Sequence, residues 1–309
     1  MLSIVGTMYQ SAPYLEEFVT RSLRAAEGLD DTVEIVLVND GSPDDSLTIA
    51  RRLADAHSQV RVIDLSRNFG HHRAMMAGLE HARGERMFLI DVDLEEPPEL
   101  LPQFWQRMQA DRDIDVIYGQ LAQRRGGLFD YITGNAYYML IRYLGDVPLP
   151  RNLATVRLMT RRYVDGLLQY REREGFMAGL WHSTGFRQEA FRFEKGNKGS
   201  TSYSLRRKLS LIVNSVTAFS AKPLKMIFYT GVLISMAGAL FAAWLVYRRL
   251  FHQIPVDGYT SMMVSIWFLG GLIILFLGVI GIYLAKVFSE VKQRPYVTVR
   301  EVYDGRSDH

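Results

Sequence analysis

The first half of the chain repeats one pattern: a short apolar run, a polar turn, and a segment whose apolar residues recur every three to four positions. The short runs predict strands buried on both faces, and the longer segments predict amphipathic helices. The predicted strands are Leu2–Thr7, Val33–Val38, Val60–Leu65, Met87–Ile90 and Ile114–Tyr118. The predicted helices are Pro13–Ala26, Asp44–Ala56, His71–Ala82 and Glu99–Ala110. Repeated strand–helix units predict an α/β fold with a mostly parallel sheet between two layers of helices.

Beyond the fifth predicted strand the alternation becomes weaker. We predict helices at Phe129–Leu144 and Arg161–Tyr170, strands at Val156–Met159 and within Thr184–Phe193, and a loop of lysine, glycine and serine at Lys195–Ser202. In Tyr203–Ser220 the apolar residues share one helical face, with three consecutive basic residues beside it. This segment predicts an amphipathic helix that lies in a membrane interface with its cations near anionic headgroups.

Two long apolar segments follow, at about Met226–Tyr247 and Met262–Ala285, and neither contains a charged residue. At ~1.5 Å per residue, each is long enough to cross a ~30 Å hydrocarbon layer. Lysine and arginine are frequent before the first segment and after the second, whereas the loop between them carries only Arg248 and Arg249. Because basic residues favour the cytoplasmic side, we expect two transmembrane helices with both termini in the cytoplasm.

The last stretch, Pro295–Tyr303, places β-branched and aromatic residues on both faces of an extended chain, which predicts a strand. A lone strand is unstable in water because its backbone groups need a partner edge. That edge could belong to its own domain or to a neighbouring subunit, and a frayed tail is the alternative. We expect it to pair with another protomer, which makes the protein a homo-oligomer, either a dimer or a tetramer. The expected division is a catalytic domain at residues 1–202, an interface helix at 203–222, a transmembrane pair at 223–288 and a tail strand at 289–309.

Polar residues directly follow several predicted strands. Asp40, Asn68 and Asp91 each stand at the carboxyl end of an apolar run, where open parallel sheets bind their ligands. Asp91 also begins an acidic turn that includes Asp93 and Glu95. Carboxylate oxygens suit Mg²⁺ or Mn²⁺ that bridges phosphates, so this turn is a candidate metal site. The alternative interpretation is an acidic loop exposed to solvent.

Composition narrows the chemistry further. Cysteine is absent, which excludes disulfides, thiolate metal sites and a cysteine nucleophile. The net charge of +3 is modest, but residues 195–256 contain no Asp or Glu, and their first third is rich in lysine and arginine. The N-terminal residues lack a basic segment followed by a long apolar core, so we expect no signal peptide.

Five motifs, in order along the chain, resemble those of the family-2 inverting glycosyltransferases. They are VNDGSPD at Val38–Asp44, LSRNFG at Leu65–Gly70, DVDLEEPPE at Asp91–Glu99, RLMTRR at Arg157–Arg162 and KGSTSYSLR at Lys198–Arg206. Within that family the chain is similar to the polyisoprenyl-phosphate glycosyltransferases, relatives of dolichyl-phosphate mannose synthase. The two apolar segments match the bacterial undecaprenyl-phosphate branch. The resemblance covers nearly the whole chain and implies a GT-A (Rossmann-like) catalytic domain.

The resemblance implies roles for the residues that match its motifs. The donor nucleotide is expected at Tyr9, Asp40, Asn68 and Asp91. Asp93 corresponds to a metal ligand, and Glu95 stands where relatives often have Gln, also a metal contact, so the implied cofactor is Mg²⁺ or Mn²⁺. A structural alternative is that Asp40 and Ser42 cap the helix that follows.

The acceptor phosphate is expected among basic side chains, because guanidinium groups bind phosphate well. The residues implied are Arg124, Arg125, Arg192, Lys198, Tyr203 and Arg206. The residues implied in catalysis are Asp93, Arg157 and Arg124. Ordinary headgroup binding and a solvated charge pair are the alternatives for these cations. His71 and His72 follow Gly70 at the start of a predicted helix, from which either could reach the site, but we interpret them as residues of the helix surface.

The chain departs from the family at two positions. Relatives usually carry Asp two residues before the arginine equivalent to Arg157, where this chain has Thr155, and they often have Arg near Leu121. A lipid phosphate is already anionic at neutral pH, so it needs positioning and charge screening more than a strong base. Asp93 and Glu96 remain candidates for electrostatic effects on the acceptor.

Taken with the resemblance, these residues predict a metal-dependent inverting glycosyltransferase of the bacterial inner membrane. We expect transfer from a nucleotide-diphosphate sugar, with UDP favoured and GDP as the alternative, to undecaprenyl phosphate. The expected partners are donor, lipid acceptor, membrane lipids and further copies of the chain, and not nucleic acid. A processive polysaccharide synthase is disfavoured because no Trp follows an Arg. The rival from another class is a non-catalytic relative that binds a nucleotide sugar or a partner.

Overall fold

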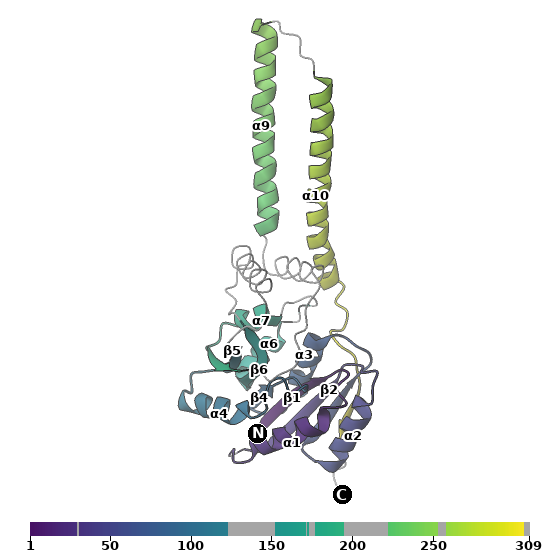
Figure 1. The fold of residues 1–309 in the computed structure, drawn as a ribbon, viewed down its shortest axis with the longest axis vertical. Coiled ribbons are helices and arrows are strands. Elements are labelled where there is room, and N and C mark those ends of the chain that lie inside the picture. The colour runs from purple at the N-terminus through teal and green to yellow at the C-terminus, as the bar shows by residue number, and fades with distance from the viewer. Residues whose placement is uncertain are drawn as a thin grey trace. The chain divides into compact units, whose positions relative to one another are not determined.

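A computed structural model describes residues 1–29, 31–122, 152–170, 172, 177–194, 222–252 and 258–305 (Figure 1). The chain divides into two compact units. The first comprises residues 1–134, 149–202 and 294–309, and the second comprises residues 135–148 and 203–293. The predicted helices at Phe129–Leu144 and Tyr203–Ser220 and the loop Lys195–Ser202 lie outside the described residues.

The first unit is built on one eight-stranded sheet with the order β7-β5-β6-β4-β1-β2-β3-β8. The strands are β1 (Leu2–Met8), β2 (Val33–Asn39), β3 (Val60–Leu65), β4 (Arg86–Leu89), β5 (Val116–Leu121), β6 (Leu153–Thr160), β7 (Gln188–Phe193) and β8 (Val299–Asp304). Only β6 and β8 run opposite to the others, so the prediction of a mostly parallel sheet is confirmed. Every residue of β1 and β3 is buried, as expected for strands covered on both faces.

Six helices accompany this sheet among the described residues of the first unit. They are α1 (Leu15–Ala26), α2 (Ser46–Ala56), α3 (His71–His81), α4 (Leu100–Ala110), α6 (Arg161–Leu168) and α7 (Met177–Ser183). Right-handed crossovers put α1 and α2 on one face, and the return from β3 to β4 puts α3 on the other. Accordingly, α1 packs against α2 and α4, and α3 packs against α6. The sequence pattern did not predict helix α7, and β7 forms the C-terminal part of the strand predicted at Thr184–Phe193.

The close packing of α3 on the sheet fixes where that helix begins. At Gly78, a Cβ atom would lie 2.5 Å from Cγ1 of Val5 and 2.9 Å from Cγ2 of Val38. Only a residue without a side chain lets α3 approach β1 and β2 this closely. The N-terminus of α3 is thereby held beside the carboxyl ends of β1 and β2, where the polar strand ends gather.

The second unit contains two long helices, α9 (Lys222–His252) and α10 (Tyr259–Val291), which include both predicted apolar segments. The windows Lys222–Phe241 and Ser265–Val291 are long and apolar enough to cross a membrane, with mean hydropathies of 1.7 and 2.5. Neither window is buried within the structure. Large apolar side chains that no other part of the protein covers are typical of helices that lie in the hydrocarbon layer of a membrane.

The C-terminal strand β8 pairs antiparallel with β3 of its own chain. The predicted strand is therefore confirmed, but the expectation that it adds to another protomer is wrong. The reason is charge matching along the edge: Arg61, 8% exposed, forms ion pairs with Asp304 of the tail and with Glu34 at 3.6 Å. The oligomeric state stays a prediction. In the catalytic domain expected at residues 1–202, the tail supplies the edge strand.

We predict that deletion of residues 295–309 lowers the melting temperature of the protein by roughly 10 °C. The deletion uncovers the backbone of β3 and leaves the buried Arg61 without Asp304. Thermal unfolding in detergent measures the effect, and deletion of residues 306–309, which leaves β8 complete, is the control. Equal melting temperatures for both deletions would show that β8 does not support the sheet.

Candidate active site

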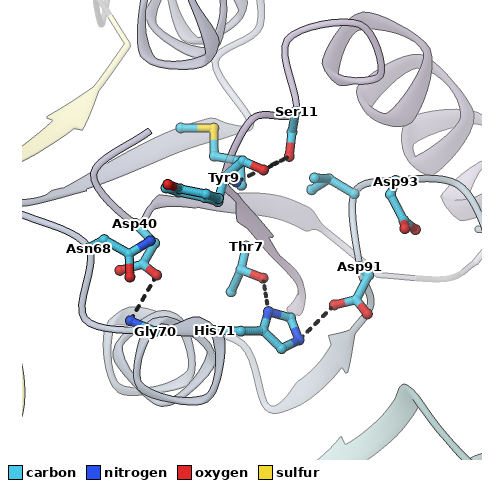
Figure 2. Close-up of a pocket in the computed structure, with 11 residues that line it drawn as sticks. Thr7, Tyr9, Ser11, Asp40, Asn68, Gly70, His71, Asp91 and Asp93 are labelled. Carbon is cyan, nitrogen blue, oxygen red and sulfur yellow. Dashed lines mark hydrogen bonds and ion pairs between the residues drawn. The ribbon is translucent and has the colours of Figure 1, made fainter. Parts of the chain in front are cut away.

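A cavity of about 390 Å³ opens at the carboxyl ends of the four central parallel strands (Figure 2). From β1 the sheet continues through β2 and β3 on one side, whereas β4 lies on the other side of β1. The order of strands therefore reverses between β1 and β4, and such a switch point is where α/β sheets bind ligands. The lining residues are Thr7, Met8, Tyr9, Ser11, Asp40, Asn68, Gly70, His71, Asp91, Val92 and Asp93. All four residues expected at the donor nucleotide are among them.

At one end of the cavity, the Asp40 carboxylate holds the loop that follows β3. Its oxygens accept hydrogen bonds from the backbone N–H groups of Phe69 at 2.7 Å and Gly70 at 3.0 Å. Burial raises the pKa of Asp40 above its ordinary value, while the two amides oppose that rise. Gly70 adopts a positive φ of 98°, which suits glycine, and this turn brings the start of α3 into the cavity.

The alternative role for Asp40, as a cap of α2, is not what the structure shows. The N-cap residue of α2 is Asp45, and the carboxylate that binds the first residue of the helix is that of Asp44: its Oδ1 accepts from the Ser46 N–H at 3.2 Å and from the Ser46 hydroxyl at 2.6 Å. Asp40 therefore keeps its carboxylate at the cavity. Each carboxylate oxygen can accept more than one hydrogen bond, so Asp40 can also accept from the base of a bound nucleotide.

Tyr9 stands at the mouth of the cavity with its side chain 47% exposed. Its backbone N–H donates to the Ser11 hydroxyl at 3.1 Å, and the Ser11 N–H donates to the Ser46 hydroxyl at 3.0 Å. These bonds tie the segment after β1 to the start of α2. Figure 2 shows the Tyr9 ring on the side of the cavity that holds Asp40 and Asn68, where an aromatic face offers a stacking surface.

His71 joins the two ends of the cavity, which corrects the interpretation of this residue as helix surface. Its Nδ1 lies 3.0 Å from the Thr7 hydroxyl, and its Nε2 lies 3.3 Å from Oδ1 of Asp91 (Figure 2). Thr7 is a site residue that sequence reasoning missed, and His71 confirms the less favoured of its two interpretations, a histidine that reaches the site from the start of a helix. The signal available for Thr7 was its position at the carboxyl end of β1, which corresponds to that of Asp40 after β2.

Asp91 and Asp93 form the acidic end of the cavity. The Glu95 N–H donates to Oδ1 of Asp93 at 3.0 Å across a turn in which Leu94 has a positive φ of 61°. Glu95 does not line the cavity, and the described residues include no group of three or more His, Cys, Asp or Glu side chains placed to hold a metal ion. Two carboxylates fit Mg²⁺ or Mn²⁺, which fill their remaining positions with phosphate oxygens and water.

Glu96 has a structural function, which corrects the expectation that it acts on the acceptor. Its side chain is buried, and its two oxygens accept from the backbone N–H groups of Thr155 at 2.9 Å and Val156 at 2.8 Å. These bonds attach the acidic turn after β4 to strand β6. Thr155, at the position where the family resemblance implies a carboxylate, lies at this junction.

Arg157 lies in the interior of the domain, 1% exposed, and does not line the cavity. It donates to the carbonyls of Thr155 at 3.1 Å and Ala154 at 3.3 Å, and its guanidinium lies on the Trp181 ring. Burial lowers the pKa of Arg157 to about 10, so it stays charged at neutral pH. These contacts are structural, and a catalytic role for Arg157 stays a prediction.

The residues expected at the acceptor phosphate are only partly described. Arg192 is exposed on the edge strand β7 and does not line the cavity. The other five, Arg124, Arg125, Lys198, Tyr203 and Arg206, lie outside the described residues. Their roles remain predictions.

Comparison with known proteins places this geometry in a family. Residues 3–193 match the model of glycosyl transferase family 2, which is more than half of the chain. The chain belongs to this family. It is a glycosyltransferase with a GT-A fold, and the cavity occupies the half of the chain that carries the match.

Two relatives extend over almost the whole length of this glycosyltransferase. A protein of Mycobacterium tuberculosis that carries a glycosyltransferase name is 48% identical over 98% of this chain and 88% of its own. A bactoprenol glucosyl transferase of Shigella flexneri, derived from a prophage, is 32% identical over 88% of this chain and 89% of its own. Together with the two apolar helices, this relationship indicates a membrane-associated protein.

A solved structure of mannosyl-3-phosphoglycerate synthase from Rubrobacter xylanophilus has a TM-score of 0.48 and 16% identity, covering 75% of each chain.

We predict that Glu96→Ala destabilises the catalytic domain by about 2–4 kcal/mol, because two buried amides of β6 lose their acceptor. Denaturant unfolding of the full chain in detergent, followed by tryptophan fluorescence, measures the loss. Glu95→Ala, one residue earlier and outside these bonds, is the matched control. A Glu96→Ala variant as stable as Glu95→Ala would contradict the structural role.

Proposed function

We propose that this glycosyltransferase moves a sugar from a nucleotide-diphosphate donor to a polyprenyl phosphate, with inversion at the anomeric carbon. The observation that carries the proposal is the cavity at the switch point of the sheet, with Asp40 and Asn68 at one end and Asp91 and Asp93 at the other. A nucleotide and its diphosphate need different partners, and the two ends supply them. UDP is the favoured nucleotide, and GDP is the alternative.

At the nucleotide end, Asp40 accepts from the base and the Tyr9 ring covers it. At the acidic end, Asp93 beside Asp91 would hold Mg²⁺ or Mn²⁺, which when bound neutralises the charge of the leaving diphosphate. Glu95, which does not line the cavity, is proposed as a further ligand that would turn toward the bound ion. His71 holds the Thr7 hydroxyl and the Asp91 carboxylate in fixed positions between the two ends. The donor is thereby oriented before the acceptor arrives, which lowers the entropic part of the barrier.

The acceptor proposed is undecaprenyl phosphate, in keeping with the bactoprenol in the name of the Shigella flexneri relative. Its phosphate oxygen is anionic at neutral pH and attacks the anomeric carbon without a strong general base. This chemistry suits a chain that has Thr155 at the position where relatives carry a carboxylate. Arg124, Arg125, Arg192, Lys198, Tyr203 and Arg206 are proposed to hold the acceptor phosphate, and α9 and α10 to anchor the enzyme beside its lipid substrate.

We predict that Asp93→Asn removes most transfer, by about 100-fold or more, because one ligand charge at the diphosphate is lost. The measurement is mass spectrometry of the prenyl-linked product that purified protein forms from undecaprenyl phosphate and a panel of UDP- and GDP-sugars. Mn²⁺ binding by electron paramagnetic resonance, with nucleotide present, reports the metal separately from activity.

Glu27→Gln, an exposed carboxylate at the end of α1, is the control and should keep full activity. If Asp93→Asn bound Mn²⁺ and turned over as the wild type does, the metal role would be abandoned. If wild-type protein formed no prenyl-linked sugar from any donor, the non-catalytic alternative would replace the proposed function.

The proposed topology places both termini in the cytoplasm and only the segment between α9 and α10 outside. We predict that a cysteine introduced at Gly258 reacts with an impermeant maleimide in intact cells, and that one introduced at His309 reacts only after the membrane is opened. The chain has no native cysteine, so each label reports a single position. Labelling of both positions from the same side would show that one apolar helix does not span.

A further inference from the structure

The C-terminal strand makes one irregular contact with the sheet, at Arg300. In the β8–β3 pairing, Asp64 lies opposite Glu301 and Leu65 lies opposite Val299, so Arg300 is the extra residue of a β-bulge. A bulge interrupts the alternation of side chains and turns the extra residue in a new direction. The direction that Arg300 takes is set by its partners.

Arg300 binds two groups at the end of β3. Its guanidinium donates from one nitrogen to Oδ2 of Asp64 at 3.1 Å and from another to the carbonyl of Ser66 at 2.7 Å. The Asp64 side chain is 3% exposed, whereas that of Arg300 is 58% exposed. A buried carboxylate requires a paired charge or several hydrogen-bond donors, and Arg300 is the cation that pairs with Asp64.

The other oxygen of Asp64 continues the network toward the cavity. Oδ1 of Asp64 accepts from the Asn39 side-chain amide at 2.8 Å, and Asn39 is itself buried. Oδ1 of Asn39 accepts from the Ser42 N–H at 3.1 Å, and the Ser42 hydroxyl accepts from the Gln10 N–H at 2.7 Å. One line of hydrogen bonds thus runs from the tail strand to the segment after β1.

Each step of this line lies next to a residue of the nucleotide end. Asn39 precedes Asp40, Gln10 follows Tyr9, and Ser66 begins the loop that contains Asn68. Ser66 is held a second time, because its N–H donates to the carbonyl of Thr298 in the tail at 2.9 Å. Arg300 is therefore connected by hydrogen bonds to the loops after β1, β2 and β3, although its own side chain does not line the cavity.

We propose that Arg300 is a positioning residue for the donor nucleotide, acting through Asp64 and Asn39 on the three loops that form that end of the cavity. The inference rests on the proposed function for its ligand, a nucleoside diphosphate sugar, and on the hydrogen bonds above for its mechanism. The tail that follows α10 is then part of the donor site, and its strand holds the loops in the conformation that binds.

The test compares Arg300→Ala with Arg51→Ala in the full-length protein. Arg51, on α2, also binds the tail, through an ion pair to Glu301 and a cation–π contact to Tyr303, but it does not contact the three loops. Both variants weaken the attachment of the tail, and measurement of their melting temperatures checks that they lose similar stability. Arg300→Lys keeps a cation for Asp64 but has no planar fork with which to bind Ser66 as well.

Hydrogen exchange needs no ligand and tests the network alone. We expect the amides of Gln10 and Ser42 to exchange about tenfold faster in Arg300→Ala, to change less in Arg300→Lys, and to stay as in wild type in Arg51→Ala. For transfer, we expect Arg300→Ala to raise the donor KM about tenfold with kcat within about twofold, because the lost positioning weakens donor binding.

Unchanged exchange at Gln10 and Ser42 in Arg300→Ala would overturn the proposal, and so would equal changes in Arg51→Ala, which would show a merely structural role. An unchanged donor KM despite faster exchange would also overturn it. Absence of transfer by the wild type would instead refute the proposed function, while the exchange data would still decide whether Arg300 holds the loops.

Discussion

The site depends on the Asp40 carboxylate, which binds the loop of the neighbouring strand through the amides of Phe69 and Gly70. Parallel strands bring their carboxyl ends to one edge but leave the loops beyond them free to separate. A buried carboxylate is costly unless donors surround it, so the loop after β3 must stay where its two amides satisfy Asp40. This requirement gives the cavity a fixed wall and brings the start of α3, with His71, between the two ends.

The carboxylates in and near the cavity have different roles, which depend on what their oxygens bind. Carboxylates whose oxygens are satisfied by backbone amides hold the structure together, as Asp40 does for one loop and Glu96 does for the join between the acidic turn and β6. Asp91 and Asp93 line the opposite end of the cavity from Asp40, where carboxylate charge suits a cation and, through it, a diphosphate. A glycosyltransferase that uses an already anionic acceptor needs this rigidity more than it needs a strong base.

Local pattern predicted the order of strands and helices well, because buried parallel strands and amphipathic helices have distinct periods. It also placed Asp40, Asn68 and Asp91 correctly, since polar residues at the ends of apolar runs meet at one edge. What failed depended on contacts between distant residues. The partner of β8 is set by buried charges such as Arg61, and the roles of Glu96 and His71 are set by which backbone or side chain lies opposite, which no spacing in the sequence reveals.

The central claim is that the nucleotide binds between the loops that follow β1, β2 and β3. Photoaffinity labelling with azido derivatives of UDP and GDP, followed by peptide mapping, tests it most directly. The account predicts labelled peptides that contain Tyr9 or residues 66–71, with labelling abolished by excess unlabelled nucleotide. Competable labelling confined to peptides of β5, β7 or the apolar helices would contradict it.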